Sequence, residues 1–411
     1  MKKMIFTLAA LLIASVSFVS CSSDDEIEKE IPAAKTYKLS INASKGGDTR
    51  ALTIDDSGEK NVLNASWTAG DEVSVYDAND DFIGTLTAQL NGNATILEGE
   101  LTTPLSVGDV LTLKYKSPNY AAQDGTLAGI AANCDYATAT TTVATIEDHN
   151  ITATDAGFTN QQAIVKFTLI DGGSGSDHID ASHLTFSDGT NSYVVTASPA
   201  TDVLYVAIPG FASKTVSLFA KVGSDVYGYA KSGVTFTNGK YYEITMKMSK
   251  AEVGKYFGAN GKIYDNTGEA ASAGTTAEAM IAYVGTQAGV CDYGLAIALE
   301  DIESYKMTYA QAVGEYGISK WATNHPVPGG TWRLPSFKDW QYMVWGYYIE
   351  DPVSAPVGGE VKTVLGGTYY WTSTSVDADN AKLFYYDGSN YGSFSNNPKE
   401  NYWNVRACLA F

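Results

Sequence analysis

Basic side chains are scarce in this sequence, and histidine is scarcer still. The 411 residues contain 27 Lys and Arg against 46 Asp and Glu, which gives a net charge of −19, and they contain only 4 His. A surface with this acidic excess has little with which to neutralise phosphates, so we do not expect a nucleic-acid partner. No Gly-x-Ser-x-Gly elbow, His-Glu-x-x-His pair or phosphate-binding loop occurs, so we do not expect an enzyme.

Metal-ligand spacings are missing as well. The only His and Asp cluster consists of Asp177, His178, Asp180 and His183. Its spacing between strands matches no strong metal signature. The motif Asp77-x-Asn79-x-Asp81 opens like a calcium loop, but Phe82 replaces the required Gly and Ala88 replaces the final Glu. We therefore predict a hairpin turn there, and no cofactor or metal for the chain.

Long apolar runs are absent except for a short one at the N-terminus. Lys2 and Lys3 precede an apolar stretch from Met4 to Val19, and Cys21 follows it directly after a small residue. The run is too short to remain as a membrane span, and a Cys at this place is where lipoproteins are cut and acylated. We predict a lipoprotein signal peptide over 1–20 and lipidation at Cys21; an ordinary signal peptide is the alternative.

An acidic stretch follows the predicted lipidation site. Ser22-Ser23-Asp24-Asp25-Glu26 resembles the surface-export signal of Bacteroidia lipoproteins. This resemblance implies an outer-membrane lipoprotein precursor that is carried to the cell surface. Residues 21–35 are charged, contain Pro and have few large apolar groups, so we expect an acidic tether.

Besides the lipidated Cys21, three cysteines remain after such processing: Cys134, Cys291 and Cys408. One pair of them can be oxidised to a disulfide once the protein is exported. We expect that pair to be Cys291 and Cys408, because both lie in the C-terminal segment, and Cys134 to stay free.

The rest of the composition favours β structure. The sequence contains 39 glycines and 27 tyrosines, together with many Thr and Ser, and this composition indicates antiparallel strands with tight turns. From Tyr37 to about Lys250 short alternating strands predict hairpins at 71–87 and 203–222, and the Thr-rich stretch 138–142 predicts a loop. We therefore assign two β-sandwich domains: 36–152 and 153–250.

Residues 255–411 have a different pattern, with clustered Trp and two helix candidates. The candidates are Thr308–Tyr316 and Ser336–Trp345. Ser336 can cap the second helix, with Asp339 in place of the Glu of a capping box. We predict a mixed α+β domain here. Together with the two β-sandwich domains, it makes the chain as a whole mainly β.

Three segments of the first two domains carry a family resemblance. They are Trp67-Thr-Ala-Gly-Asp71-Glu-Val-Ser-Val-Tyr76, Phe158 with Ala163-Ile-Val-Lys-Phe-Thr-Leu169, and Val234-Thr-Phe-Thr-Asn-Gly-Lys-Tyr-Tyr242. In their order and spacing they resemble the fimbrillin family, the fimbrial (pilus) subunits of Bacteroidia, over residues 35–250. The resemblance implies transthyretin-like β-sandwiches and other fimbrial subunits as partners.

This resemblance also implies a proteolytic switch. Arg50 and Ala51 fall where fimbrillins are cut by an Arg-specific protease. Cleavage would release the strand around Tyr37 to Ile41 and leave an apolar groove that a neighbouring subunit's donor strand enters. Tyr37, Leu39 and Ile41 alternate as a groove-filling strand should. The alternative is that Arg50 is one Arg in an exposed loop.

The third region resembles a different family. Gly294-Leu-Ala-Ile-Ala-Leu299, Trp332-Arg-Leu-Pro-Ser336, Tyr370-Trp-Thr-Ser-Thr374 and Val405-Arg-Ala-Cys408 occur in order. They resemble the bacterial C-type-lectin-like domains of the Trp-Arg-Leu-Pro type, over residues 255–411. True calcium-dependent lectins end with Trp-Asn-Asp, whereas Val405 follows Trp403-Asn404 here, so one carboxylate ligand is missing.

A polar and aromatic cluster before the last strand is our candidate ligand site. Its members are Tyr391, Asn397, Glu400, Asn401, Tyr402, Trp403 and Asn404. Exposed aromatics act as stacking platforms and interface anchors. The cluster can bind sugar hydroxyls or calcium, or it can be a solvated loop.

These observations lead to three hypotheses. The leading one is a fimbrial tip adhesin that binds glycan or a host-surface protein. We predict that Val405–Phe411 forms the closing strand of its own domain, so it cannot serve as a donor strand for another subunit. The second is a surface lipoprotein that does not polymerise and binds glycan or matrix. A Cys- or metal-dependent enzyme that uses Cys291 or His178 is the third and least favoured.

Overall fold

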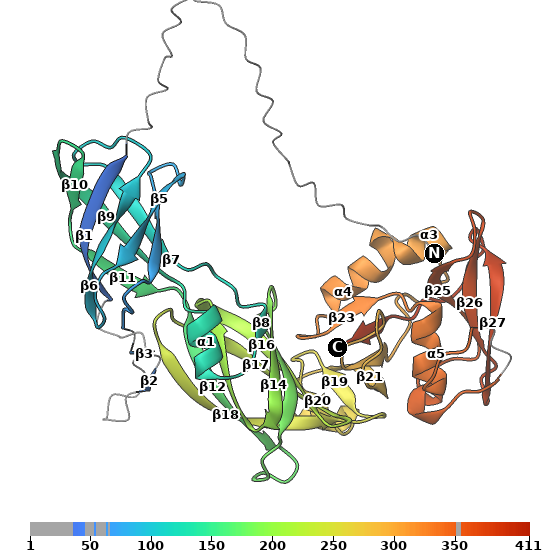
Figure 1. Cartoon of the computed structure of the whole chain (residues 1–411). Coiled ribbons are helices and arrows are strands. Elements are labelled where there is room, and N and C mark those ends of the chain that lie inside the picture. Colours follow the sequence, from blue (N-terminus) through green and yellow to red (C-terminus); the bar gives the residue numbers. More distant parts are fainter. Residues whose placement is uncertain (1–35, 46–52, 55–62, 65, 351–354) are drawn as a thin grey trace, which may run out of the picture. The chain divides into compact units, whose positions relative to one another are not determined.

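The structure is a computed structural model that describes residues 36–45, 53–54, 63–64, 66–350 and 355–411. The chain is mainly β, as predicted, and its described strands form three large sheets, one four-stranded sheet and one two-stranded sheet (Figure 1). Four hydrophobic clusters lie inside and between these sheets.

The N-terminal domain is an eight-stranded sheet that closes on itself. Its strands are β1 (Tyr37–Lys45), β4 (Glu72–Tyr76), β5 (Phe82–Ala88), β6 (Ala94–Leu101), β7 (Val110–Tyr115), β9 (Ala137–Glu147), β10 (Asn150–Ala153) and β11 (Ala156–Asn160). Short strands β2 (Thr53–Ile54) and β3 (Leu63–Asn64) pair with each other. The predicted hairpin at 71–87 is confirmed, since β4 and β5 pair antiparallel and Asp77 caps the turn through the N–H groups of Asn79 and Asp81.

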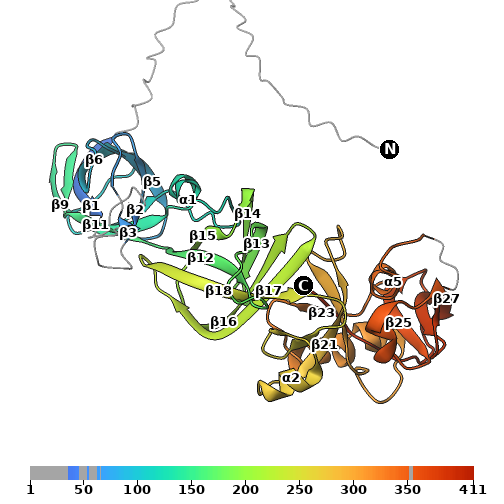
Figure 2. The ribbon, with the colours of Figure 1, turned by 90° about the horizontal axis from the view of Figure 1, so that it is seen from below.

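The second domain has its own eight-stranded sheet and one helix. Its elements are β8 (Ala122–Gln123), α1 (Leu127–Asn133), β12 (Ala163–Asp171), β13 (Ala181–Ser187), β14 (Ser192–Thr201), β15 (Val203–Ile208), β16 (Phe211–Val222), β17 (Asp225–Phe236) and β18 (Tyr241–Ala251). The long strands β16 and β18 are seen from below in Figure 2. A separate apolar core that includes Phe167 and Phe186 lies inside this sheet.

The division between these two cores differs from the predicted boundary at residues 152 and 153. Tyr120, Ile130 and Cys134 pack into the second core, whereas Ala156 and Phe158 belong to the first. The chain therefore enters the second domain with β8 and α1, returns for β9 to β11, and enters again with β12. The Thr-rich stretch is the strand β9 and not a loop, because its β-branched residues alternate with the inward-facing Ala137 and Ala139.

A second correction concerns the hairpin predicted for 203–222. β15 pairs with β12, and β16 pairs with β13 and β17, so the segment at Pro209 and Gly210 carries the chain from one part of the sheet to another. The outer edge of β15 is covered by a side chain. Gln123 accepts from the Ala207 N–H at 2.8 Å and donates to the Ala207 carbonyl at 2.9 Å, which replaces strand pairing on that edge.

The C-terminal domain combines two sheets with short helices. The six-stranded sheet contains β19 (Tyr256–Gly258), β20 (Ile263–Tyr264), β21 (Ala277–Val284), β22 (Gly294–Ala298), β23 (Thr331–Arg333) and β28 (Cys408–Ala410). The four-stranded sheet contains β24 (Ala355–Pro356), β25 (Tyr369–Ser375), β26 (Asn380–Tyr386) and β27 (Tyr391–Pro398). The helical segments are α2 (Thr267–Ser272), α3 (Tyr309–Val313), η1 (Glu315–Ser319), α4 (Lys320–Asn324), α5 (Phe337–Trp345) and η2 (Gly359–Thr363).

Both predicted helices are present, and the capping box is confirmed. The Ser336 hydroxyl accepts from the Asp339 N–H at 3.1 Å, and the Asp339 carboxylate accepts from the Ser336 N–H at 2.7 Å. The same carboxylate binds Arg333 through Nε at 3.1 Å and Nη2 at 2.7 Å. Arg333 therefore anchors the start of α5. The closing strand is shorter than predicted, since only Cys408–Ala410 forms β28.

Candidate functional site

Strand β1 is the seam that closes the N-terminal sheet. It pairs antiparallel with β6 over eight residues, from Tyr37 opposite Leu101 to Ser44 opposite Ala94. On its other edge it pairs parallel with β10 and then with β11. Without β1 the sheet would have two unpaired edges, each with free backbone N–H and C=O groups.

The two faces of β1 differ as the sequence predicts. Leu39, Ile41 and Ala43 are 0%, 1% and 2% exposed and belong to the first core. Ser40 and Asn42 alternate with them and point outward, where Asn42 donates to the Asp155 carboxylate at 3.2 Å. The inward side chains would leave an apolar groove if the strand departed.

The second candidate site lies on the four-stranded sheet of the C-terminal domain. One face of this sheet covers α5: Tyr370 and Phe384 are opposite each other, and both rings lie against Trp340. Because side chains alternate along a strand, the neighbours Tyr369 and Tyr385 point to the opposite face. Their rings are 4.5 Å apart between centroids.

Most of this second face is buried, since Trp371, Ala381 and Leu383 are 0% exposed in an apolar cluster, and an aromatic row lies at its partly exposed end. Tyr369 contacts Trp403 with centroids 4.8 Å apart, so that Tyr385, Tyr369 and Trp403 form three rings in contact. All three rings are only partly buried. Lys306 adds a cation, with its Nζ 5.4 Å from the centroid of the Trp403 ring. We call Tyr385, Tyr369 and Trp403 the aromatic row.

Polar groups border the aromatic row. Asn397 accepts from Asn401 Nδ2 at 2.7 Å and from Trp403 Nε1 at 3.3 Å, so the amide fixes the indole. Along β27, Ser393 lies opposite Tyr385, and Ser395 and Asn397 follow on the same face. The rings are tilted by 32° and 44° to their neighbours, and a partly exposed ring beside hydroxyl and amide groups can stack on a sugar ring while these groups hydrogen-bond to its hydroxyls.

The predicted ligand residues divide into two groups. Asn397, Asn401 and Trp403 meet at the aromatic row, and Glu400 and Tyr402 are exposed on the turn between them. Asn404 and Tyr391 do not join this contact.

Asn404 is turned away from the surface. Its Nδ2 donates to Asp301 at 2.6 Å, and Arg406 Nε donates to the same carboxylate at 2.7 Å. Arg406 also donates to the Ala298 carbonyl at 2.9 Å. Asn404, one of the predicted ligand residues, therefore has structural partners.

Tyr391 lies at the other end of β27 from Asn397. Six residues of strand separate them by about 20 Å, at about 3.3 Å per residue. Tyr391 is 51% exposed and sits diagonally across from Tyr385, within reach of a long ligand. Asp387 holds the turn before it, accepting from the N–H groups of Ser389, Asn390 and Tyr391 at 2.8, 2.9 and 3.0 Å. These bonds lower the pKa of Asp387 to about 2.

Cys134, Cys291 and Cys408 are buried free thiols in the structure. Cys291 and Cys408 belong to the same apolar cluster. Burial raises the pKa of Cys291 to about 11 and raises that of Cys408 further, so both thiols stay protonated at neutral pH. The predicted disulfide between them stays a prediction.

Several predicted features lie outside the described residues. They are the signal peptide, Cys21, the acidic tether, and the cleavage site at Arg50 and Ala51. In the part of the chain that the structure describes, no group of three or more His, Cys, Asp or Glu is arranged to hold a metal. His178 instead pairs with Asp202.

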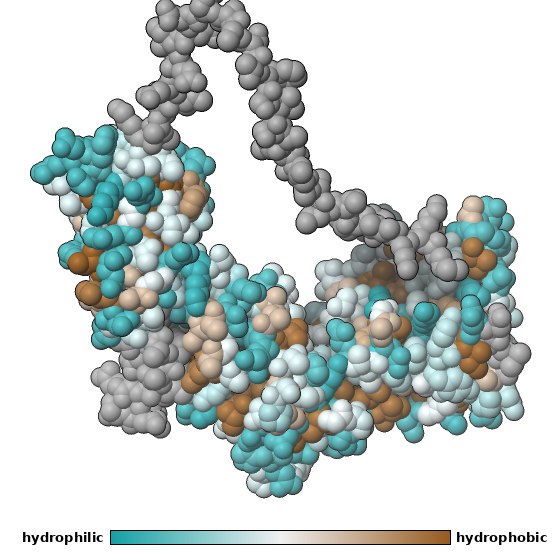
Figure 3. Space-filling view, in the orientation of Figure 1, coloured by the Kyte–Doolittle hydropathy of each residue, from teal (hydrophilic) through white to brown (hydrophobic). Residues whose placement is uncertain are grey.

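Apolar residues on the surface are mixed with hydrophilic ones. Figure 3 shows small apolar groups separated by polar side chains on the face in view. Among the described helices, none has the length and apolar character needed to span a membrane.

Two members of the aromatic row were not singled out from the sequence. Tyr369 and Tyr385 each stand beside a second Tyr, and strand alternation alone separates the outward ring from the buried one. Knowing the register of β25 against β26 would have found them.

No family model matches the sequence, and no curated protein matches it. Among solved structures, a fimbrial protein from Bacteroides ovatus is 13% identical, with 92% of this chain and 99% of that chain covered and a TM-score of 0.32. A fimbrial assembly protein from Parabacteroides distasonis is 16% identical, with 52% and 92% covered and a TM-score of 0.30. A shaft pilin from Lactobacillus rhamnosus GG is 10% identical, with 53% and 99% covered and a TM-score of 0.25. The similarity of this chain to these two fimbrial proteins and one shaft pilin is thus at low identity.

Proposed function

We propose that the protein is a cell-surface fimbrial subunit that assembles by strand addition and acts as a tip adhesin. The observation that carries this proposal is β1. It is paired on both edges, fills the first core with Leu39, Ile41 and Ala43, and is followed by the predicted protease site at Arg50. Cutting after Arg50 would leave β1 held only by non-covalent contacts.

The groove left by β1 suits an incoming extended strand. The edge of β6 offers an antiparallel partner over eight residues, and β10 and β11 offer a parallel one. Backbone hydrogen bonds on both sides supply affinity, and the pockets of Leu39, Ile41 and Ala43 supply register. A donor strand with apolar residues at alternate positions fits this groove.

The tip position is supported by the pairing of the strand β28. It lies between β22 and β23 and is hydrogen-bonded to both. Cys408 and Leu409 are fully buried, so releasing this strand as a donor would dismantle the C-terminal sheet. The protein accepts a donor strand and does not give β28 in return.

The aromatic row is the ligand-binding surface in this proposal. Its partly exposed rings, with Asn397, Asn401 and Ser395 beside them, suit a glycan or a surface protein that presents flat apolar groups. The C-type-lectin-like resemblance of residues 255–411 agrees with this assignment. The alternative is a surface lipoprotein that binds a ligand through the same aromatic row but is not cleaved at Arg50, so that β1 stays in its sheet.

The experiment uses the purified protein, an Arg-specific protease and a fluorescent peptide with the sequence of Tyr37–Lys45. N-terminal sequencing after digestion should give a chain that starts at Ala51. The labelled peptide should then exchange into the cleaved protein and leave the intact protein unlabelled. Arg50→Lys keeps the charge but removes the protease site, so this variant should stay intact and unlabelled.

Two results would contradict parts of the proposal. Cleavage at Arg50 with no peptide exchange would rule out a removable β1 and favour the lipoprotein that does not polymerise. Homopolymers formed by the cleaved protein alone would rule out the tip position.

A further inference from the structure

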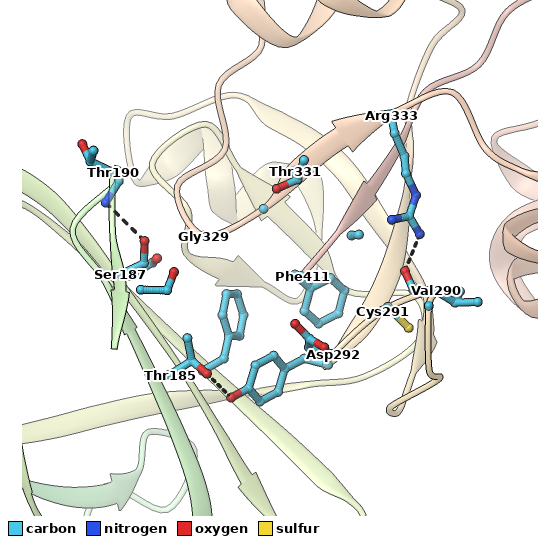
Figure 4. Close-up of a pocket in the computed structure, with 18 residues that line it drawn as sticks. Thr185, Ser187, Thr190, Val290, Cys291, Asp292, Gly329, Thr331, Arg333 and Phe411 are labelled. Atoms are coloured by element: carbon cyan, nitrogen blue, oxygen red, sulfur yellow. Dashed lines mark hydrogen bonds between the residues drawn. The ribbon is translucent and has the colours of Figure 1, made fainter. Parts of the chain in front are cut away.

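A cleft of about 600 Å³ opens between the second domain and the C-terminal domain (Figure 4). One wall comes from β13, β16 and the turn that follows β13. The other comes from the loop 289–293, the segment 329–333 and Phe411. This volume falls in the range of small-molecule sites, roughly 300–1,000 Å³. The cleft shares no residue with the aromatic row.

The floor of the cleft is aromatic. The rings of Phe219 and Tyr293 stack with centroids 5.4 Å apart, and Phe411 lies 5.5 Å from Phe219. Tyr293 and Thr185 share a hydrogen bond of 2.6 Å between their hydroxyls, and burial raises the pKa of Tyr293 to about 12. The floor is therefore fixed and uncharged at neutral pH.

Hydroxyl groups line the walls above this floor. The key one is Ser217, which is only 3% exposed, lines the cleft and makes no hydrogen bond through its hydroxyl among the described residues. Its oxygen is not among the fully buried polar atoms without a partner, so it reaches the cleft and is free to hydrogen-bond to a ligand hydroxyl. Ser187, Thr190, Ser192 and Thr331 supply further hydroxyls to the same space.

A glycine keeps the Ser217 hydroxyl uncovered. Gly329 has φ +85, a conformation that other residues adopt only with strain, and a Cβ there would lie 2.6 Å from Ser217 Oγ. The backbone can pass close to the opposite wall only because this side chain is missing. A side chain at position 329 would clash with Ser217 Oγ.

The charges in the cleft select against an anionic ligand. Asp292 lines the cleft, is exposed, and makes no ion pair within the part of the chain that the structure describes. Figure 4 shows its carboxylate beside the Phe411 ring. Arg333 is already bound to Asp339 and to the Val290 carbonyl. A free carboxylate, several hydroxyls and an aromatic floor suit a neutral polyol, because the carboxylate accepts from two of its hydroxyls.

We propose that this cleft is a second binding site, for a neutral saccharide of one or two rings. Asp292 and Ser217 bind its hydroxyls, and the C–H face of the ring lies over Phe219, Tyr293 and Phe411. The cleft is separate from the aromatic row, so this proposal does not depend on ligand binding at the aromatic row.

The experiment is saturation-transfer NMR and calorimetry on the whole protein with a panel of neutral mono- and disaccharides at millimolar concentration. At least one neutral saccharide should bind. Asp292→Asn should weaken its binding about tenfold or more, since a hydrogen bond to a charged group is lost. Thr331→Tyr fills the cleft from an exposed position of β23 and should abolish the binding.

Two control variants keep the test specific. Asp180→Asn removes the same charge at an exposed position outside the cleft and should leave the affinity unchanged, whereas Tyr385→Ala reports separately on any saccharide bound at the aromatic row. The proposal is overturned if no neutral saccharide binds, or if binding survives Thr331→Tyr. It is also overturned if Tyr385→Ala removes the binding, because the saccharide would then occupy the aromatic row.

Discussion

At the scale of single residues, the outward ring of Tyr385 decides whether the aromatic row can bind. It contacts Tyr369 and lies opposite Ser393, at the partly exposed end of its face of the sheet. We expect Tyr385→Ala to weaken ligand binding by about tenfold or more, since aromatic anchors at binding surfaces contribute roughly 2 kcal/mol. The measurement is adhesion of the purified protein to a glycan and matrix-protein array.

Tyr316→Ala is the matched control for this variant. Tyr316 is 70% exposed and is not part of the aromatic row, so its removal should leave binding intact. Equal losses from both variants would mean that the aromatic row is not the binding surface.

Asp387 gives a pH prediction at the same scale. Backbone hydrogen bonds from Ser389 and Tyr391 lower its pKa from 3.8 to about 2. Because the pKa is lower in the folded protein than in the unfolded chain, the ionised carboxylate stabilises the turn at pH values above its ordinary pKa. This stabilisation is lost as the pH falls through about 2. Carboxyl ¹³C NMR should show Asp387 titrating near pH 2. A midpoint near 4 would mean that the turn does not hold Tyr391.

At the scale of elements, β1 should contribute strongly to the stability of the N-terminal domain. Leu39→Ala removes a fully buried side chain from the first core and should cost about 2–5 kcal/mol of unfolding free energy, measured by urea denaturation. Ser44→Ala changes an exposed position on the same strand and should stay within about 0.5 kcal/mol. A similar small loss from Leu39→Ala would show that β1 does not fill the core.

The elements also show how far the sequence alone could lead. Hairpin β4–β5 and helix α5 were predictable, because an Asx turn and a capping box are local signals. The pairing of β15 and the path of α1 depend on contacts between residues far apart in the chain, such as Gln123 with Ala207. The aromatic row has the same cause, since β25, β26 and the loop at Trp403 meet only in the folded domain.

At the scale of the whole molecule, the second and C-terminal domains share a core. Val216 to Ala220 of β16 are buried on both faces: Leu218 packs into the second core, while Phe219 packs with Phe257 and Phe411. A continuous run of buried residues such as this one is typical of a strand covered on both sides. The predicted boundary at 250–255 therefore does not separate independent folding units, and ligand binding is best tested on the whole protein.

Phe219→Ala tests this coupling. Loss of a large buried ring should cost about 3–5 kcal/mol, which lowers the Tm of the unit formed by these two domains by roughly 10 °C. Calorimetry should show the transition of the N-terminal domain unchanged, because its core contains none of these residues. Phe82→Ala, at a 58% exposed position, should shift neither transition appreciably. If the C-terminal domain of Phe219→Ala melted separately and at an unchanged temperature, the shared core would not couple the two domains. A force applied by a ligand bound at the aromatic row would then not be transmitted to the second domain.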